Sequence, residues 1–150
     1  MQLGCKYISL PGMEVSDLKS VLKSHKLRVT DCRLDVIDFF LTKKRALSQS
    51  TLEANFSQYD RVTLYRTLHS FLASGILHRI PNENGIATYG LCHTTCTPEG
   101  HEHNHIHFKC NSCGEIECLD DKKVPHVSVP DGYSIERVNL IVDGTCAACT

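Results

Sequence analysis

The fold of the first half of the chain follows from the segment DRVTLYRTLHSFLASGILHRIPNENGIATYGLC, residues 60–92. Its first part has the spacing of a helix over residues 61–74, which Asp60 can cap at the N-terminus and Gly75 can close at the C-terminus. After Gly75 the apolar period changes, so the helix is expected to lead directly into extended chain. The positions predicted to face inward from this helix are Val62, Tyr65, Leu68 and Leu72.

The extended part of this stretch is predicted to be a hairpin. Residues 76–80 and 87–92 are strand-like, and an Asn-Gly turn signal at 84–85 lies between them. Short helices are predicted before it, with Ser16 and Thr30 as the first two N-caps and a capping box of Ser50 and Glu53 for the third. Helices followed by a two-stranded hairpin describe a winged helix, in which the helix before the wing enters the major groove of DNA.

The last third of the chain is rich in potential metal ligands. Two Cys-x-x-Cys pairs lie in the last 41 residues, and a histidine run precedes the first pair. Each pair can place two thiolates on one metal ion, and two pairs supply the four soft ligands of a closed tetrahedral zinc site. The residues concerned are Cys110, Cys113, Cys146 and Cys149 in the pairs, and His103, His105 and His107 in the run. Reduced structural thiols and a redox pair are the alternative interpretations.

Composition favours a cytoplasmic protein. The chain has 150 residues, no apolar run long enough to span a membrane, and no secretory signal at its N-terminus. Nine cysteines is an odd number, and in a reducing compartment paired cysteines more often bind metal than form disulfides. Residues 1–89 carry 12 Lys and Arg against 8 Asp and Glu, whereas residues 90–150 carry 4 against 9. The basic half is the one expected to meet a polyanion.

These patterns predict an α+β chain in two domains. We expect an N-terminal extension at 1–14, a winged-helix DNA-binding domain at 15–92, a hinge or linker at 93–104, and a small α/β metal-binding domain at 105–150. Strands are expected in the last of these at 105–109, 115–119 and 133–142, and Pro125 and Pro130 argue against a long helix between the last two.

The order of these motifs resembles the ferric uptake regulator family of metal-dependent transcriptional repressors, most closely its zinc uptake regulator branch. The matching segments are Arg28-Val-Thr30 with Arg33, Arg61-Val-Thr-Leu-Tyr65-Arg66-Thr-Leu68, Gly75-Ile-Leu, the histidine run into Phe108-Lys-Cys110, and Gly144-x-Cys146-x-x-Cys149. The resemblance implies structural zinc on the two cysteine pairs, a homodimer formed by the C-terminal half, an operator of double-stranded DNA, and a second metal that turns on DNA binding.

The same resemblance implies where the regulatory metal binds. Cys92 falls where zinc uptake regulators carry their sensing cysteine, and His78 falls at the wing position that also supplies a ligand. The predicted set is His78, Cys92, His105 and His107, with His103 as a substitute and Cys118 as a further candidate. Cys118 stands where iron and peroxide sensors carry a carboxylate, so the soft ligands favour Zn²⁺ over Fe²⁺ or Mn²⁺.

The residues predicted to contact DNA are Arg28, Arg61, Thr63, Tyr65 and Arg66. Arginine can reach guanine edges or phosphates, and Thr or Tyr can contact a thymine methyl group. For Tyr65, packing in the core is the alternative. The function predicted is zinc-sensing control of metal uptake genes by a repressor. An iron or manganese sensor, a thiol-based redox or peroxide-responsive protein, and a zinc-stapled protein adaptor are the alternatives, and no catalytic constellation indicates an enzyme.

Overall fold

The computed structural model describes residues 15–92, 106–119, 122, 124–136 and 138–150 of the chain. It divides into two compact units, Met1–His101 and Glu102–Thr150, and the division falls within the predicted linker at 93–104, which lies outside the described residues. Among the described residues, none of the helices has the length and apolar character needed to cross a membrane.

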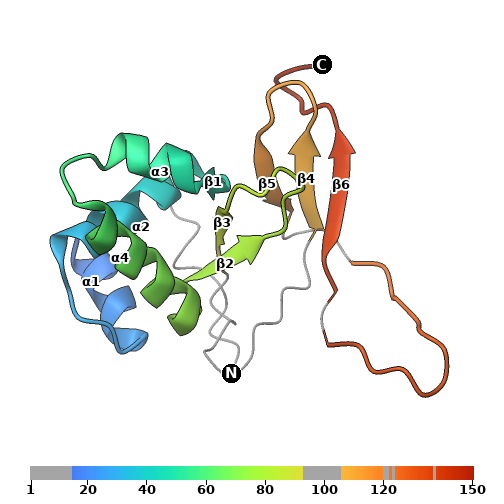
Figure 1. The fold of residues 1–150 in the computed structure, drawn as a ribbon, viewed down its shortest axis with the longest axis horizontal. Helices are drawn as coiled ribbons and strands as arrows, with labels where there is room; N and C mark the ends of the chain where they lie inside the picture. The colour runs from blue at the N-terminus through green and yellow to red at the C-terminus, as the bar shows by residue number, and fades with distance from the viewer. Residues whose placement is uncertain (1–14, 93–105, 120–121, 123, 137) are drawn as a thin grey trace. The chain divides into compact units, whose positions relative to one another are not determined.

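The first unit is a set of helices followed by a small antiparallel sheet (Figure 1). Its elements are α1 (Val15–Ser24), α2 (Asp31–Lys43), β1 (Leu47–Ser48), α3 (Gln49–Asn55), α4 (Arg61–Ser74), β2 (Leu77–Ile80) and β3 (Thr88–Leu91). The strands are ordered β1-β3-β2, with β2 and β3 forming the hairpin. The winged helix and the mixed α and β class predicted from the sequence are therefore confirmed.

Local capping chemistry explains where most of these helices begin and end. The Thr30 and Asp60 side chains accept hydrogen bonds from the backbone N–H groups of Arg33 and Thr63, as N-caps of α2 and α4. Gly75 ends α4 in the left-handed region at φ 78°, where a glycine is favoured. These caps confirm the sequence prediction.

Two other predicted caps are wrong. Ser16 lies inside α1, which begins at Val15, and its carbonyl accepts a hydrogen bond from the Ser20 hydroxyl. The N-cap of α3 is Ser48, whose side chain accepts from the Thr51 N–H at 3.1 Å. Ser50 is inside the helix, so the Ser50–Glu53 spacing does not make a capping box.

Alanine substitutions at Ser48 and Ser50 distinguish the observed cap from the predicted one. Ser48→Ala should lower the free energy of unfolding by about 1 kcal/mol, because the Thr51 N–H loses its acceptor. Ser50→Ala removes a hydroxyl that hydrogen-bonds to the Ser48 hydroxyl at 2.9 Å but is not the acceptor of the Thr51 N–H, and it should stay within about 0.5 kcal/mol of the parent. Urea unfolding of both variants measures the pair, and equal losses would contradict the assignment of the cap.

The hydrophobic core of the first unit is formed by one face of α4 packed against the other helices and the sheet. Its buried members on α4 are Leu64, Leu68 and Phe71, at helical spacing. Of the four positions predicted to face inward, Leu68 is buried and Leu72 is half-buried against the core, whereas Val62 and Tyr65 are each 57% exposed. The correction follows from the helical phase, because Leu64 and Phe71 lie with Leu68 on the apolar stripe.

The second unit is a three-stranded sheet of order β5-β4-β6, formed by β4 (Ile106–Cys110), β5 (Ile116–Leu119) and β6 (Leu140–Gly144). β5 is antiparallel to β4 and β6 is parallel to it. The predicted strand at 133–142 is wrong in its bounds, since β6 begins at Leu140. Its register explains this, because Leu140 pairs with Ile106, the first residue of β4. No helix occurs in the described residues 124–136, which contain Pro125 and Pro130.

Candidate metal centres and nucleic-acid interface

The parallel pairing of β4 and β6 brings the two cysteine pairs to the same end of the sheet. Cys110 is the last residue of β4 and lies in register with Gly144, the last residue of β6. A turn follows each strand, closed by hydrogen bonds from the Gly114 N–H to the Cys110 carbonyl and from the Cys149 N–H to the Cys146 carbonyl, both 2.9 Å. Each Cys-x-x-Cys pair therefore lies on a tight turn.

Gly144 allows the two strands to approach at this end. A Cβ atom at Gly144 would lie 3.0 Å from the Phe108 ring, which is too close for an undisturbed contact. The Gly144 carbonyl accepts a hydrogen bond of 2.7 Å from the Asn111 N–H, which joins the first turn to the end of β6. The glycine and the ring thus fix the relative position of the two cysteine turns.

The four sulfur atoms of this cluster have the spacing of a single-ion site. The sulfurs of Cys110, Cys113, Cys146 and Cys149 all lie within 4.8 Å of one another. The Cys113 and Cys146 sulfurs are 3.9 Å apart, and four sulfurs about 2.3 Å from one tetrahedral ion lie about 3.8 Å apart. The residues present therefore fit an ion that binds four thiolates.

The surroundings of the cluster favour the thiolate form of Cys110 and the protonated form of Cys149. The Cys146 N–H donates to the Cys110 sulfur at 3.3 Å, and backbone donors from Cys113 and Cys146 lower the pKa of Cys110 to about 6. The neighbouring thiols Cys146 and Cys113 raise the pKa of Cys149 to about 12. Four thiols this close cannot all ionise in the absence of a cation, because each added negative charge opposes the next.

A second pair of potential ligands lies in the hairpin of the first unit. His78 is on β2 opposite Gly90 of β3, and Cys92 follows β3, where its N–H donates to the Ile76 carbonyl at 2.9 Å. This register makes His78 and Cys92 diagonal neighbours on one face. The Cys92 sulfur lies 3.5 Å from His78 Nδ1, and both side chains are buried.

The second unit has a comparable pair of its own. His107 of β4 lies directly opposite Cys118 of β5, so the two side chains are on the same face of the sheet. His107 is buried and Cys118 is half-buried. His103 and His105, the other members of the predicted set, lie outside the described residues. Each unit therefore supplies one imidazole beside one thiol.

The exposed face of α4 carries the residues predicted to contact DNA. Arg61, Tyr65 and Arg66 are exposed, and the Tyr65 ring lies 6.2 Å from the exposed His69 ring, measured between centroids. The exposure of Tyr65 rules out the alternative of core packing. Thr63 is exposed, but its hydroxyl donates to Asp60 at 2.6 Å within the helix cap. Arg28 is exposed just before α2, where its carbonyl accepts from the Arg33 guanidinium.

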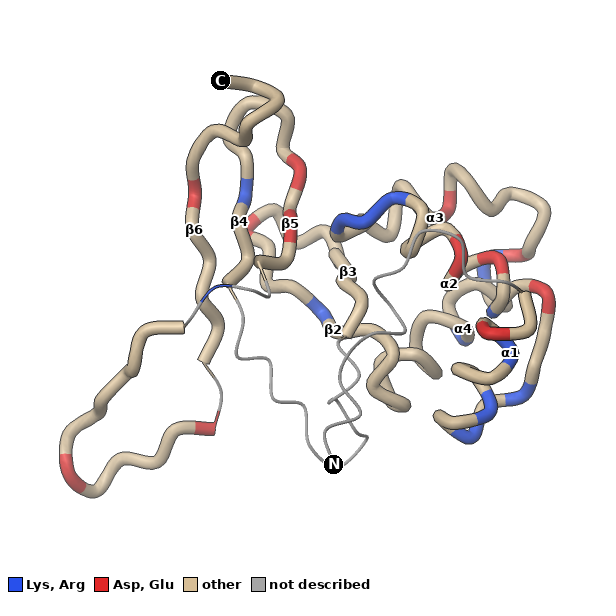
Figure 2. Tube along the Cα trace, turned by 180° about the vertical axis from the view of Figure 1, so that it is seen from behind, with Lys and Arg blue, Asp and Glu red and all other residues tan. Residues whose placement is uncertain are grey.

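The distribution of charge differs between the units. Figure 2 shows acidic positions on β5 and β6 with a basic position on β4, and both basic and acidic positions among the helices and loops of the first unit. The excess of Lys and Arg over Asp and Glu lies in residues 1–89. A nucleic acid would therefore meet favourable charge on the first unit.

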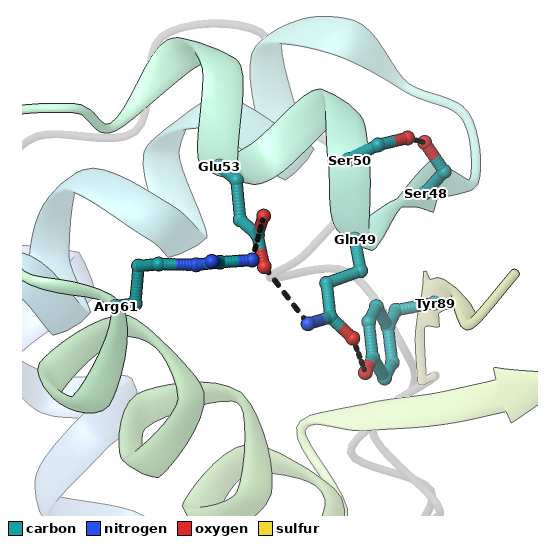
Figure 3. Close-up of polar contacts among 6 residues, drawn as sticks. All are labelled: Ser48, Gln49, Ser50, Glu53, Arg61 and Tyr89. Atoms are coloured by element: carbon teal, nitrogen blue, oxygen red, sulfur yellow. Dashed lines mark hydrogen bonds and ion pairs between the residues drawn. The ribbon is translucent and has the colours of Figure 1, made fainter.

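Glu53 has partners other than the helix cap that the sequence predicts for it. Glu53 accepts a hydrogen bond from the Arg61 guanidinium at 3.2 Å and another from Gln49 Nε2 at 2.9 Å (Figure 3). Its predicted role was in a helix cap. The spacing of Gln49 and Glu53 by one helical turn was the available signal, but the approach of Arg61 depends on how α3 and α4 pack.

The comparisons with known proteins agree with this arrangement. The sequence profile of the ferric uptake regulator family matches residues 24–141. The ferric uptake regulation protein of Staphylococcus aureus is 28% identical over 143 residues, covering 91% of this chain and 98% of that relative.

Two solved structures share the fold of the chain. A zinc uptake regulator complexed with zinc and DNA has a TM-score of 0.59 at 22% identity, covering 90% of this chain and 91% of its own. Holo XcZur has a TM-score of 0.61 at 21% identity, covering 91% of this chain and 98% of its own. At these identities the structures support the fold, while the profile match, which spans most of the chain, identifies the family. The chain belongs to the ferric uptake regulator family of metal-responsive transcriptional regulators, which bind DNA and are not enzymes.

Proposed function

We propose that the protein is a zinc-sensing repressor that controls metal uptake genes, acting as a homodimer on double-stranded operator DNA in the cytoplasm. The observation that carries the proposal is the buried His78–Cys92 pair, with its sulfur 3.5 Å from the imidazole nitrogen. A thiol beside an imidazole suits zinc, whereas iron(II) and manganese(II) sites in proteins favour carboxylate oxygen with imidazole.

The His107–Cys118 pair supports the same metal. It also combines nitrogen with sulfur, and neither pair brings a carboxylate directly opposite its histidine in the strand register. We assign His78, Cys92 and His107 to the regulatory site, with the remaining ligand drawn from His105, His103 or Cys118.

The four-cysteine cluster is assigned a separate, structural zinc. Its sulfurs are at one end of the second unit's sheet and have the spacing of a closed tetrahedral site. A site with four protein ligands has no open position, so it is suited to holding the fold rather than to sensing. This assignment separates a permanent zinc from a reversible one.

The exposed α4 residues are assigned to operator recognition. Arg61, Tyr65 and Arg66 would enter the major groove, where arginine can read guanine and an aromatic ring can contact a thymine methyl group. Thr63 is placed near a phosphate or base edge at the start of the helix, and Arg28 is placed at the neighbouring backbone or minor groove. Contacts of this kind to phosphates make binding strongly dependent on salt.

Exposed apolar side chains on the second unit support a homodimer through residues 90–150. Tyr133 is 73% exposed, and Ile135 and Val142 are also exposed. Exposed apolar groups in such number on a small unit are typical of an interface. Two copies related by a two-fold axis would place their α4 helices on half-sites roughly 34 Å apart or a multiple of that.

Zinc stoichiometry tests the proposal. The parent should bind about two zinc ions per protomer, one of which survives dialysis against a mild chelator. Cys92→Ser should bind about one, because serine is a poor zinc ligand. The measurement is metal analysis by mass spectrometry of the intact protein.

Cys32→Ser is the matched control, since Cys32 is another buried cysteine of the first unit and its sulfur accepts a hydrogen bond from Thr67. It should keep the parent's zinc content. A Cys92→Ser protein that still binds as much zinc as the parent would remove Cys92 from the site, and a parent that takes up iron(II) in preference to zinc would support the iron-sensing alternative.

A further inference from the structure

Arg61 is held by a carboxylate from a neighbouring helix. It is the first residue of α4, and its Nη2 lies 3.2 Å from Oε2 of Glu53 in α3. The Arg61 side chain is 85% exposed and that of Glu53 is 30% exposed (Figure 3). The guanidinium therefore has one nitrogen on the protein and most of its surface in solvent.

Glu53 is itself fixed on its other oxygen. Gln49 Nε2 donates to Glu53 Oε1 at 2.9 Å, and the Tyr89 hydroxyl of β3 donates to Gln49 Oε1 at 3.5 Å. The Gln49 N–H also donates to the Ala87 carbonyl at 2.8 Å, which anchors the start of α3 to the hairpin. A continuous row of contacts thus runs from β3 through α3 to Arg61, as Figure 3 shows.

The row lowers the pKa of Glu53. The hydrogen bond from Gln49 is the main cause that lowers the pKa of Glu53, followed by the charge of Arg61. An ion pair this exposed contributes little to the stability of a protein. Its effect is on geometry, because Glu53 restricts a side chain that would otherwise lose much rotamer freedom on binding.

The orientation of the Arg61 guanidinium determines whether it can recognise a base edge in the major groove. Guanine presents N7 and O6 as neighbouring acceptors, and a guanidinium recognises both with two N–H groups in a fixed fork. A phosphate, in contrast, can be contacted from many directions. A fixed guanidinium with its remaining donors in solvent is suited to the first task.

We propose that Glu53 is a positioning residue that presents Arg61 to the edge of a guanine, and that Gln49 and Tyr89 hold Glu53 for this purpose. The proposal rests on the proposed function, in that α4 must enter the groove of an operator. It assigns to Arg61 a base-reading role, and to Glu53 a role in sequence specificity exerted through Arg61.

The test uses the zinc-loaded, full-length protein and two DNA probes. One probe is a duplex selected by the parent from a randomised pool, and the other is a shuffled duplex of the same composition. Glu53→Gln should lose about tenfold in affinity for the selected duplex and change less than about twofold on the shuffled one. The slope of affinity against salt should not change, since no phosphate contact is lost.

Charge alone predicts the opposite change in DNA affinity for Glu53→Gln. Removing a negative charge near DNA would tighten binding to both probes alike. Asp38→Asn is the charge-matched control, because Asp38 is an exposed carboxylate of α2, and it should leave the ratio of the two affinities unchanged. If Glu53→Gln tightens binding to both duplexes, the positioning role is wrong.

A double-mutant cycle shows whether Glu53 acts through Arg61. Arg61→Ala should lose at least as much discrimination as Glu53→Gln, and adding Glu53→Gln to it should cause no further loss. Discrimination should fall mainly at one G·C pair of the selected duplex in both single variants. Additive losses would overturn the proposal.

Gln49→Ala provides a second variant that leaves both members of the ion pair in place, and it should reduce discrimination by a smaller factor. Unchanged discrimination in both Glu53→Gln and Gln49→Ala would overturn the inference while leaving the proposed function intact. If the zinc-loaded parent itself selects no sequence from the pool, the proposed function fails, and this inference fails with it.

Discussion

Cys146→Ser should release the structural zinc and unfold the second unit while the helices of the first unit remain folded. The reason is the small core of the second unit: in its described part, the buried side chains are His107, Cys110 and Ile116. The hydrophobic core cluster, by comparison, lies in the first unit. A structural zinc contributes an apparent binding free energy of about 10–16 kcal/mol, which is as large as the whole stability of a typical domain.

The measurement is amide hydrogen exchange of the two units after dialysis against a chelator. In Cys146→Ser, protection of the β4 and β6 amides should fall to the level of an unfolded chain, and the dimer should dissociate. Cys118→Ser is the matched control, since it removes a thiol from the same sheet but outside the four-cysteine cluster. Full protection and retained zinc in Cys146→Ser would contradict the assigned site.

Free zinc should raise the affinity of the parent for its selected duplex by at least about tenfold, and Cys92→Ser should lose this response. The energy available is the difference in zinc affinity between the arrangement that binds DNA and the others. A tenfold preference corresponds to about 1.4 kcal/mol per site, so two sites in a dimer can give about a hundredfold.

In this experiment Cys92→Ser should keep its chelator-resistant zinc and its fold, because the four-cysteine cluster is unchanged. Cys32→Ser should respond to zinc like the parent, which separates loss of a ligand from loss of any buried thiol. A Cys92→Ser protein with the full zinc response would exclude Cys92 from the switch.

The parts of the structure that the sequence predicts best depend on short-range chemistry. Thr30, Asp60 and Gly75 act within one helical turn, and the hairpin signal lies between two adjacent strands. The cysteine pairs were also found from local spacing, although only the parallel pairing of β4 with β6 shows that their four sulfurs meet.

The errors arise where several local patterns compete or where tertiary packing decides. Ser48 and Ser50 are both good caps by residue type, and the first turn of α3 follows β1 directly, which selects Ser48. Tyr65 fits an apolar spacing, but Leu64 and Leu68 occupy the buried stripe. The contact of Glu53 with Arg61 joins two helices and leaves no spacing signal within either one.

The pair of His78 and Cys92 lies between these two cases. Strand alternation alone does not show that His78 and Cys92 are diagonal neighbours, because their proximity depends on the hairpin register, in which Leu77 pairs with Leu91. The resemblance to zinc uptake regulators predicts both residues as ligands, and the register accounts for the 3.5 Å between the Cys92 sulfur and His78 Nδ1.

One titration distinguishes zinc from iron(II) and manganese(II) as the sensed metal. The parent, with its structural zinc in place, is titrated onto a fluorescent selected duplex at buffered free concentrations of zinc and, under anaerobic conditions, of iron(II) or manganese(II). We predict that zinc switches on binding, and that iron(II) and manganese(II) do so weakly at comparable occupancy. Strong activation by iron(II) or manganese(II) and a weak response to zinc would show that zinc is not the sensed metal.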